Sequence, residues 1–374
     1  MTIDFPVNSF EVTPKDIEKV VEVLKMGLIS GDTRVVREFE DKFASFLEVE
    51  NAIAVNNGSS ALDLAFTLAE LNPEDEVILP SFTIASCLFP ILRSGATPIF
   101  VDCDLETWQM NISEVKEKIT KKTRVILAVH TYGLAVEVSS LLDLCKEKNI
   151  LLIEDCAEAH GLKYNGKFCG SYGDIATFSF YANKLVTTGE GGMLIIKDTE
   201  LANKARKIRN LSFNTGRRFM HDELGWNYRL SSIQAALGIS QIDRIEKYLL
   251  SRSKVAEKYR ENLSSLPGLK WQALENKGSR NIFWVNGVLF EASIYGNAQE
   301  VSTELSKAGI ETRPFFYPLH LQPVLTEYNL VPSSLPITEH ISSQGVYLPG
   351  GNTLSLESVD LICNRIISCF TNKQ

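Results

Sequence analysis

A lysine in an unusual setting gives the first indication of chemistry. Lys184 follows the apolar run Ile175–Phe180, and the glycine-rich turn Thr187–Met193 comes directly after it. Most lysines lie on the surface, so a solvated loop residue is the ordinary interpretation. The alternative is a Schiff-base lysine, because burial or a neighbouring cation lowers the pKa of an amine and makes it a usable nucleophile. The glycines lack the G-x-G-x-x-G spacing, which argues against a nicotinamide dehydrogenase.

Two further polar segments also follow apolar runs. Asp155 stands just after the run Ile150–Ile153, and a buried carboxylate there needs a partner. It either caps the next turn or pairs with a cationic ring nitrogen and stays ionised. The segment Asn57-Gly58-Ser59-Ser60 precedes a helical pattern. One of its serines can cap that helix, or the unpaired N–H groups of the first turn can bind a phosphate.

The strands expected before these polar segments determine where the segments lie in the fold. Short β-branched runs alternate with helical patterns such as Ser60–Leu71 and Ser139–Lys148. This alternation predicts a mainly parallel seven-stranded sheet with helices on both faces, and ligands bind at the carboxyl ends of such strands. The seven runs expected to form strands are Ala52–Val55, Glu76–Leu79, Pro98–Asp102, Arg124–His130, Ile150–Glu154, Ile175–Phe180 and Met193–Lys197.

The length and patterning of the chain predict two domains. A chain of 374 residues is long for one small core. After Leu230 a helical pattern continues from Ser231 through Ile245 toward Arg260, until Pro267-Gly268 interrupts it. We place the boundary near residue 250, with a large α/β domain over residues 1–250 and a smaller α+β domain over residues 251–374.

The composition limits the partners and the compartment. A hydrophobic content of 44% and a net charge of −8 are expected of a globular protein without general affinity for nucleic acid or anionic membranes. No signal-peptide or membrane-helix pattern is found. The seven cysteines form no C-x-x-C pair, so no metal site is expected, and reduced thiols suit a cytoplasmic protein.

Together, these segments resemble the nucleotide-sugar aminotransferases of the DegT-like family. The family is a branch of the fold-type I pyridoxal 5'-phosphate (PLP) enzymes, which share the aspartate aminotransferase-like fold. The resemblance covers nearly the whole chain. It rests on Asn57-Gly58-Ser59, Ile153–Glu158, Phe178–Lys184, Thr188–Gly192, Gly225–Arg229 and Thr312-Arg313-Pro314, in that order. Glu106–Met110, Glu158 and Arg313–His320 look most like the perosamine synthases, which aminate C4 of GDP-4-keto-6-deoxymannose with glutamate as donor.

The resemblance implies a role for individual residues at the cofactor. Lys184 is expected to bond covalently to PLP and to move the proton, and Asp155 to pair with the pyridine nitrogen. Ile84 stands where many relatives carry an aromatic ring stacked on the cofactor. A homodimer with active sites at the interface is implied, because one contact comes from the neighbouring subunit. The other expected cofactor contacts are Gly58, Ser59, Glu158, Ser179 and, from that subunit, Asn227.

The substrate contacts are expected from four parts of the chain. Cations near Asn227 would bind the pyrophosphate of the nucleotide, and a loop bounded by prolines would contact the sugar. For the arginine at position 218 a solvated loop remains the alternative, and for His130 a structural histidine. The candidates are Ser30, His130, Arg218, Arg229, Arg313, Tyr317 and His320.

Other functions remain open at this point. The sugar could be a UDP- or dTDP-linked 3- or 4-keto sugar, and the product could enter polysaccharide synthesis. A dehydratase of the same family commonly has histidine in place of the lysine, so Lys184 argues against it. A non-catalytic regulatory protein would be expected to lack Lys184 or Asp155, and a desulfurase would need a reactive cysteine, for which Cys169 is a weak candidate.

Overall fold

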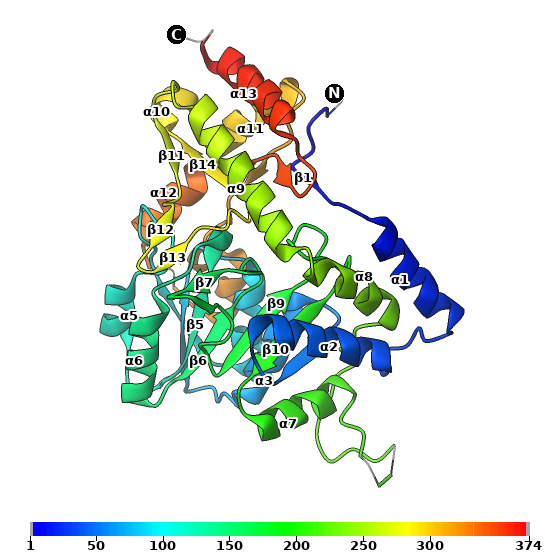
Figure 1. Ribbon diagram of the computed structural model, residues 1–374. Coiled ribbons are helices and arrows are strands. Elements are labelled where there is room, and N and C mark those ends of the chain that lie inside the picture. Colours follow the sequence, from blue (N-terminus) through cyan, green and yellow to red (C-terminus); the bar gives the residue numbers. More distant parts are fainter. Residues whose placement is uncertain (1–2, 215, 218, 332, 372–374) are drawn as a thin grey trace.

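A seven-stranded sheet forms the centre of the computed structural model, which describes residues 3–371 except 215, 218 and 332 (Figure 1). The strand order is β2-β10-β9-β6-β5-β3-β4, and β10 alone runs antiparallel to its neighbours. The predicted sheet is therefore confirmed, strand by strand. Its strands are β2 (Ala52–Val55), β3 (Glu76–Pro80), β4 (Thr97–Val101), β5 (Thr123–Val129), β6 (Leu151–Asp155), β9 (Ile175–Ser179) and β10 (Gly192–Ile196).

Helices cover both faces of this sheet, because its strands are apolar on both sides. Alternate residues of β2 point into two separate cores, with Ala52 and Ala54 in one and Ile53 and Val55 in the other. The first core is covered by α2 (Arg34–Leu47), α5 (Ile112–Lys118), α6 (Val138–Lys148) and α8 (Ser232–Ile242). The second is covered by α3 (Gly58–Leu68), α4 (Phe89–Ser94) and α7 (Thr199–Arg209).

The helical pattern after Leu230 forms two helices instead of the continuous one that was expected. α8 ends at Ile242, and α9 (Ile245–Asn262) begins after a break at Asp243 and Arg244. The Arg244 guanidinium donates to the buried carboxylate of Asp16 over 2.8 and 2.9 Å, which ties α1 (Pro14–Lys25) to this break. α9 then runs diagonally to the C-terminal part of the molecule (Figure 1).

The C-terminal part contains its own four-stranded antiparallel sheet, in the order β11-β14-β16-β15. Its strands are β11 (Leu269–Trp271), β14 (Asn286–Phe290), β15 (Arg313–Pro314) and β16 (Gly345–Leu348). Its helices and single turns are α10 (Ala292–Tyr295), α11 (Ala298–Lys307), η3 (Leu319–Leu321), η4 (Pro323–Tyr328), α12 (Pro336–Gln344) and α13 (Leu356–Thr371). The boundary near residue 250 falls inside α9 and stays a prediction.

Two small sheets connect distant parts of the chain. β1 (Asn8–Ser9) pairs with β17 (Gly350–Gly351), so the N-terminal strand lies with the C-terminal part. The second small sheet combines β7 (Lys163–Tyr164) and β8 (Lys167–Phe168) with β12 (Glu275–Asn276) and β13 (Ser279–Arg280). The remaining short turns are η1 (Ala85–Cys87) and η2 (Thr131–Gly133). Over the described residues, no helix combines the length and the apolar character that a membrane crossing requires.

Candidate active site

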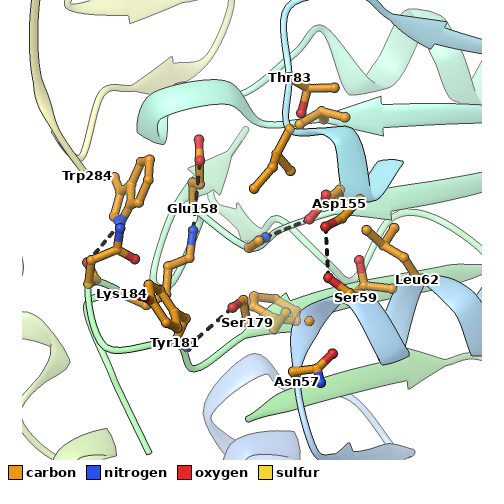
Figure 2. A pocket seen from close by; sticks show the side chains of 18 of the residues that line it. Asn57, Ser59, Leu62, Thr83, Asp155, Glu158, Ser179, Tyr181, Lys184 and Trp284 are labelled. Atoms are coloured by element: carbon orange, nitrogen blue, oxygen red, sulfur yellow. Dashed lines mark hydrogen bonds and ion pairs between the residues drawn. The ribbon is translucent and has the colours of Figure 1, made fainter. Parts of the chain in front are cut away.

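A pocket of about 590 Å³ opens at the carboxyl ends of β6 and β9, where Lys184 and Asp155 both lie (Figure 2). The N-terminus of α3 forms one wall. The opposite wall comes from the C-terminal part of the chain and consists of Trp284, Arg313, Phe316 and Tyr347. The three polar segments that the sequence singled out therefore meet in one cavity, at the position expected for a ligand of a parallel sheet.

The α3 wall is suited to an anion. Asn57 caps the helix through its side-chain oxygen, which accepts the Ser60 N–H over 2.7 Å. Of the two alternatives for this segment, the serine cap is wrong, because the preceding asparagine takes that position and Ser59 instead bonds the Ser86 hydroxyl over 2.8 Å. At Gly58 a β-carbon would lie 2.8 Å from the Cβ of Ser179, so only glycine allows the helix to approach β9. Gly58 and Ser59, the first two residues of α3, line the pocket, so an anion bound there would meet the N-terminus of the helix.

Asp155 ends β6 and is buried, 3% exposed. Its Oδ1 accepts the Ala157 N–H over 2.9 Å, and its Oδ2 accepts the Cys87 thiol over 3.1 Å. Burial raises the pKa of Cys87 well above its usual value, so the thiol keeps its proton and donates. Sequence reasoning missed Cys87, whose only signal was its place in an apolar stretch one turn before α4.

Lys184 is largely enclosed, with 11% of its side chain exposed, which excludes the interpretation as a solvated surface residue. Its Nζ lies 3.8 Å from Oε1 of Glu158 and 4.0 Å from the centre of the Trp284 ring. Burial lowers the pKa of Lys184, and the nearby Arg252 cation adds to this, whereas the Glu158 and Asp155 carboxylates act in the opposite direction. The amine is therefore easier to deprotonate than an exposed one.

Glu158 faces Lys184 across the pocket (Figure 2). The Tyr132 N–H donates to its Oε2 over 2.7 Å. Burial raises the pKa of Glu158 to about 7, although the Lys184 amine and the Tyr132 N–H both act to lower it. Near neutral pH this carboxyl can therefore either donate or accept a hydrogen bond, which suits contact with a hydroxyl that itself titrates.

The donor set matches a planar cofactor with a phosphate. An amine, a buried carboxylate and an open helix N-terminus surround one cavity. Two polar atoms on its walls, Oγ1 of Thr177 and Oδ1 of Asn183, are buried without a hydrogen-bond partner among the described residues. Because unsatisfied buried polar atoms are rare, they indicate a polar ligand in the cavity. PLP offers the ring nitrogen, aldehyde and phosphate that these groups would bind.

Two of the predicted substrate contacts, and the predicted cofactor contact Ile84, line the pocket. Ile84 is 47% exposed and Arg313 lies on the C-terminal wall. His130 also lines the pocket, but both its ring nitrogens have partners: Nδ1 accepts the Val136 N–H over 3.3 Å and Nε2 bonds the buried Glu154 over 3.0 Å. This arrangement gives His130 a structural role, and its contact with substrate stays a prediction.

The other predicted substrate contacts that the structure describes do not line this pocket. His320 is fully buried and bonds Ser81 over 2.6 Å and Glu339 over 3.2 Å, so its ring is occupied within the protein. Tyr317, in the same segment, is exposed. Arg218 lies outside the described residues. The remaining three, Ser30, Arg229 and the cofactor contact Asn227, do not line the pocket of their own chain, and their roles stay predictions.

Comparison with known proteins gives the same assignment over the length of the chain. Residues 11–367 match the model of the DegT/DnrJ/EryC1/StrS aminotransferase family. The chain is 38% identical over 368 residues to a GDP-perosamine synthase of Escherichia coli O157:H7, covering 98% of this chain and 99% of that protein. It is 36% identical over 349 residues to a GDP-perosamine synthase of Vibrio cholerae, covering 93% and 94%. The crystal structure of the aminotransferase TlmJ from Streptoalloteichus hindustanus superposes with a TM-score of 0.92 at 28% identity, covering 99% of each chain.

Proposed function

Because this chain belongs to the DegT/DnrJ/EryC1/StrS aminotransferase family, we propose that it moves the amino group of glutamate to C4 of GDP-4-keto-6-deoxymannose, with PLP as cofactor. The products would be 2-oxoglutarate and GDP-perosamine. The observation that carries the proposal is the convergence of Lys184, Asp155 and the α3 N-terminus in one cavity. Identity to two GDP-perosamine synthases over almost the full chain supports the choice of sugar.

Different residues of the pocket would have different roles in this reaction. PLP, when bound, supplies an electron sink that makes the Cα proton of an amino acid acidic. Lys184 would hold the cofactor, then take that proton from glutamate and later return a proton to the sugar carbon, acting first as base and then as acid. Asp155 would accept a hydrogen bond from the ring nitrogen. Gly58, Ser59 and Ser179 would bind the phosphate at the α3 N-terminus.

Lowered basicity of Lys184 supports its double role. A general base works best when its pKa lies near the working pH, and burial shifts the pKa of Lys184 in that direction. Glu158 would bond the cofactor hydroxyl, with one of the two groups protonated. Arg313 stands on the C-terminal wall, where it can bind a carboxylate of the amino donor or the substrate pyrophosphate.

We further propose that the enzyme works as a cytoplasmic homodimer, with Asn227 of one subunit contacting the phosphate in the other. Apolar side chains near Asn227 support an interface: Leu224 is 83% exposed, and Trp226 and Met220 are also exposed. Large exposed apolar side chains that cluster in this way are typical of interaction sites. The cysteines are free thiols, which suits a reducing compartment.

Absorbance spectroscopy tests the first half of the reaction. The purified protein with added PLP is expected to show a visible band that shifts to the near-ultraviolet when glutamate is added. Lys184→Ala is expected to bind PLP without that band. A wild-type protein with the same spectrum as Lys184→Ala would refute the role of Lys184, and a band that glutamate leaves unchanged would remove glutamate as donor.

A panel of substrates tests the second half. The glutamate-treated protein is mixed with GDP-, UDP- and dTDP-linked 4-keto and 3-keto sugars, and return of the visible band is recorded with the mass of the product. Return with GDP-4-keto-6-deoxymannose and a product bearing an amine at C4 is expected. Faster return with a UDP- or dTDP-linked sugar would reassign the substrate, and loss of a hydroxyl without amine transfer would indicate a dehydratase.

A further inference from the structure

The backbone on both sides of Lys184 is held by residues from the C-terminal part of the chain. The Trp284 indole N–H donates to the carbonyl of Asn183 over 3.2 Å. The Asn352 side-chain amide donates to the carbonyl of Leu185 over 3.1 Å. Two residues that are 68 positions apart in the sequence (352 minus 284) therefore hold the immediate neighbours of the reactive lysine. Nothing in the local sequence around Lys184 indicates this arrangement.

Arg252 connects these two residues. From α9, its Nη1–H donates to the carbonyl of Trp284, and its Nε–H donates to Oδ1 of Asn352 over 3.1 Å. Arg252 is 5% exposed, and burial is the one cause of the shift in its pKa, with no contribution from a carboxylate among the described residues. Burial lowers the pKa of Arg252 to about 10, so it remains a cation at neutral pH. A buried cation without a carboxylate partner is costly, which suggests a role other than stability.

The same residues also surround the lysine amine. The Trp284 ring lies 4.0 Å from Nζ, a distance at which its π-face attracts an ammonium. The Arg252 cation acts in the opposite direction and favours the neutral amine. The titratable and charged groups whose fields couple to Lys184 are Asp155 at the end of β6, Glu158 and His160 just beyond it, Cys87 in η1 and Arg252 in α9.

We propose that Arg252, Trp284 and Asn352, here named the lysine clamp, position the Lys184 amine for proton transfer and set its basicity. The hydrogen bonds fix the backbone on both sides of the lysine, the indole ring restricts where its amine can lie, and the buried cation makes that amine a weaker base. This inference rests on the proposed role of Lys184. Its basis is separate, because none of the three clamp residues is among the groups expected to bind PLP, although Trp284 also lines the pocket.

The first test uses the cofactor-free protein, so that it does not depend on catalysis. The Lys184 amine is modified with a small amine reagent at several pH values, and the extent is measured by peptide mass spectrometry to give its pKa. Arg252→Met is expected to raise the pKa of Lys184 by about one pH unit, because a nearby positive charge is removed. Arg252→Lys keeps the positive charge, so the pKa of Lys184 in this variant is expected to stay close to that of the wild type.

A matched control exists on the same helix. Arg260 also lies on α9, donates to the carbonyl of Gln272 over 2.7 Å, and has a pKa lowered to about 10 by burial. It is not bonded to the segment around Lys184, so Arg260→Met should leave the pKa of Lys184 unchanged. Equal values for Arg252→Met and Arg260→Met would overturn the electrostatic part of the proposal.

The positional part is tested with Trp284→Phe and Asn352→Ala in the PLP-loaded protein. Trp284→Phe keeps an aromatic ring and removes the N–H, and Asn352→Ala removes the other bond; neither changes charge. Each is expected to slow the glutamate half-reaction at saturating glutamate about tenfold and to change KM little, because a misplaced base weakens only the transition state. Unchanged rates in both variants would overturn this part.

Refutation of the lysine clamp can be distinguished from refutation of the proposed function. If the wild-type protein does not bind PLP through Lys184, the spectrum reveals it directly, whereas the labelling of the cofactor-free protein still measures the clamp. If PLP binds through Lys184 and the Arg252, Trp284 and Asn352 variants all match the Arg260→Met control, the clamp alone is refuted. Circular dichroism confirms that each variant is folded before it is compared.

Discussion

At the scale of single residues, Glu158 links pH to stability in a direction opposite to most carboxylates. Burial raises the pKa of Glu158 to about 7 in the folded chain, whereas an unfolded glutamate titrates near its usual value of 4.5. As the pH rises through this window, the unfolded chain loses the proton first. Stability is therefore full below the unfolded value and falls as the pH rises toward the folded value.

Glu158→Gln cannot titrate at position 158, so this variant is expected to lack that part of the pH dependence of stability. In the cofactor-free protein, the free energy of unfolding of the wild type relative to Glu158→Gln is expected to fall by about 2 kcal/mol between pH 5 and pH 7.5. Urea unfolding at both pH values measures it. Parallel pH dependence of the two proteins would mean that Glu158 ionises normally.

A single sequence distinguishes poorly between residues that bind a ligand and residues that are bonded within the protein. His130 and His320 were expected to contact substrate because they follow a strand and lie in a loop, yet both rings are bonded within the protein. A histidine that bonds a buried glutamate and one that bonds a sugar look alike in one sequence. Asp155 was recognisable because it ends an apolar strand, where a charge needs a partner, and Lys184 because it follows such a strand and precedes a glycine-rich turn.

At the scale of elements, the close approach of α3 to β9 fixes the expected phosphate site. A β-carbon at position 58 would lie 2.8 Å from the Cβ of Ser179, so Gly58→Ala must displace the first turn of α3. PLP affinity is expected to fall about tenfold or more, since charge-assisted hydrogen bonds from that turn would be misaligned. A spectrophotometric titration of the visible band measures it.

Ser60→Ala is the matched control for this substitution. Ser60 lies in the same turn, and its side chain does not line the pocket. It is expected to leave the PLP affinity close to that of the wild type. An equal loss of PLP affinity in both variants would mean that the turn tolerates no substitution. An unchanged PLP affinity in Gly58→Ala would mean that the phosphate binds elsewhere.

The elements themselves differ in how well the sequence predicted them. All seven strands of the large sheet were predicted because each is an apolar run, and all except the edge strand β4 are buried over most of their length, which leaves a continuous signal. The two-residue strands β7, β8, β12 and β13 were not predicted, because they form two short hairpins without a continuous apolar run, and the pairing of Tyr164 with Ser279 that joins these hairpins depends on tertiary structure. The clamp residues were missed for the same reason, since only tertiary contacts bring them to Lys184.

At the scale of the whole molecule, the proposed sharing of sites between subunits makes a prediction about mixtures. Lys184→Ala and Asn227→Ala are each expected to be nearly inactive as pure dimers. In a mixed dimer, one site combines the intact Lys184 of one chain with the intact Asn227 of the other. Co-expressed and reassembled subunits should therefore recover about a quarter of the wild-type activity, which an assay of aminated product measures.

A different activity is expected of the mixture if the active sites are not shared between subunits. If Asn227 served only its own chain, every subunit in the mixture would still carry one defect, and the activity would equal the average of the two pure variants. Sedimentation of the mixture and of the wild type at matched concentration verifies that dimers have formed and exchanged. A wild type that sediments as a monomer at assay concentration would refute the shared site directly.

The pairing of β1 with β17 also has a consequence for how the protein is made. Asn8 pairs with Gly350, and Asn352, which follows two residues later, completes the clamp. Translation proceeds from the N-terminus, so the large sheet can form while the ribosome is still adding the last part of the chain. Strand β1 meanwhile has no partner, and Leu185 lacks its bond from Asn352. A nascent chain can therefore form the α3, β6 and β9 side of its cofactor pocket before it can position its lysine, and the correctly placed amine is among the last features that synthesis completes.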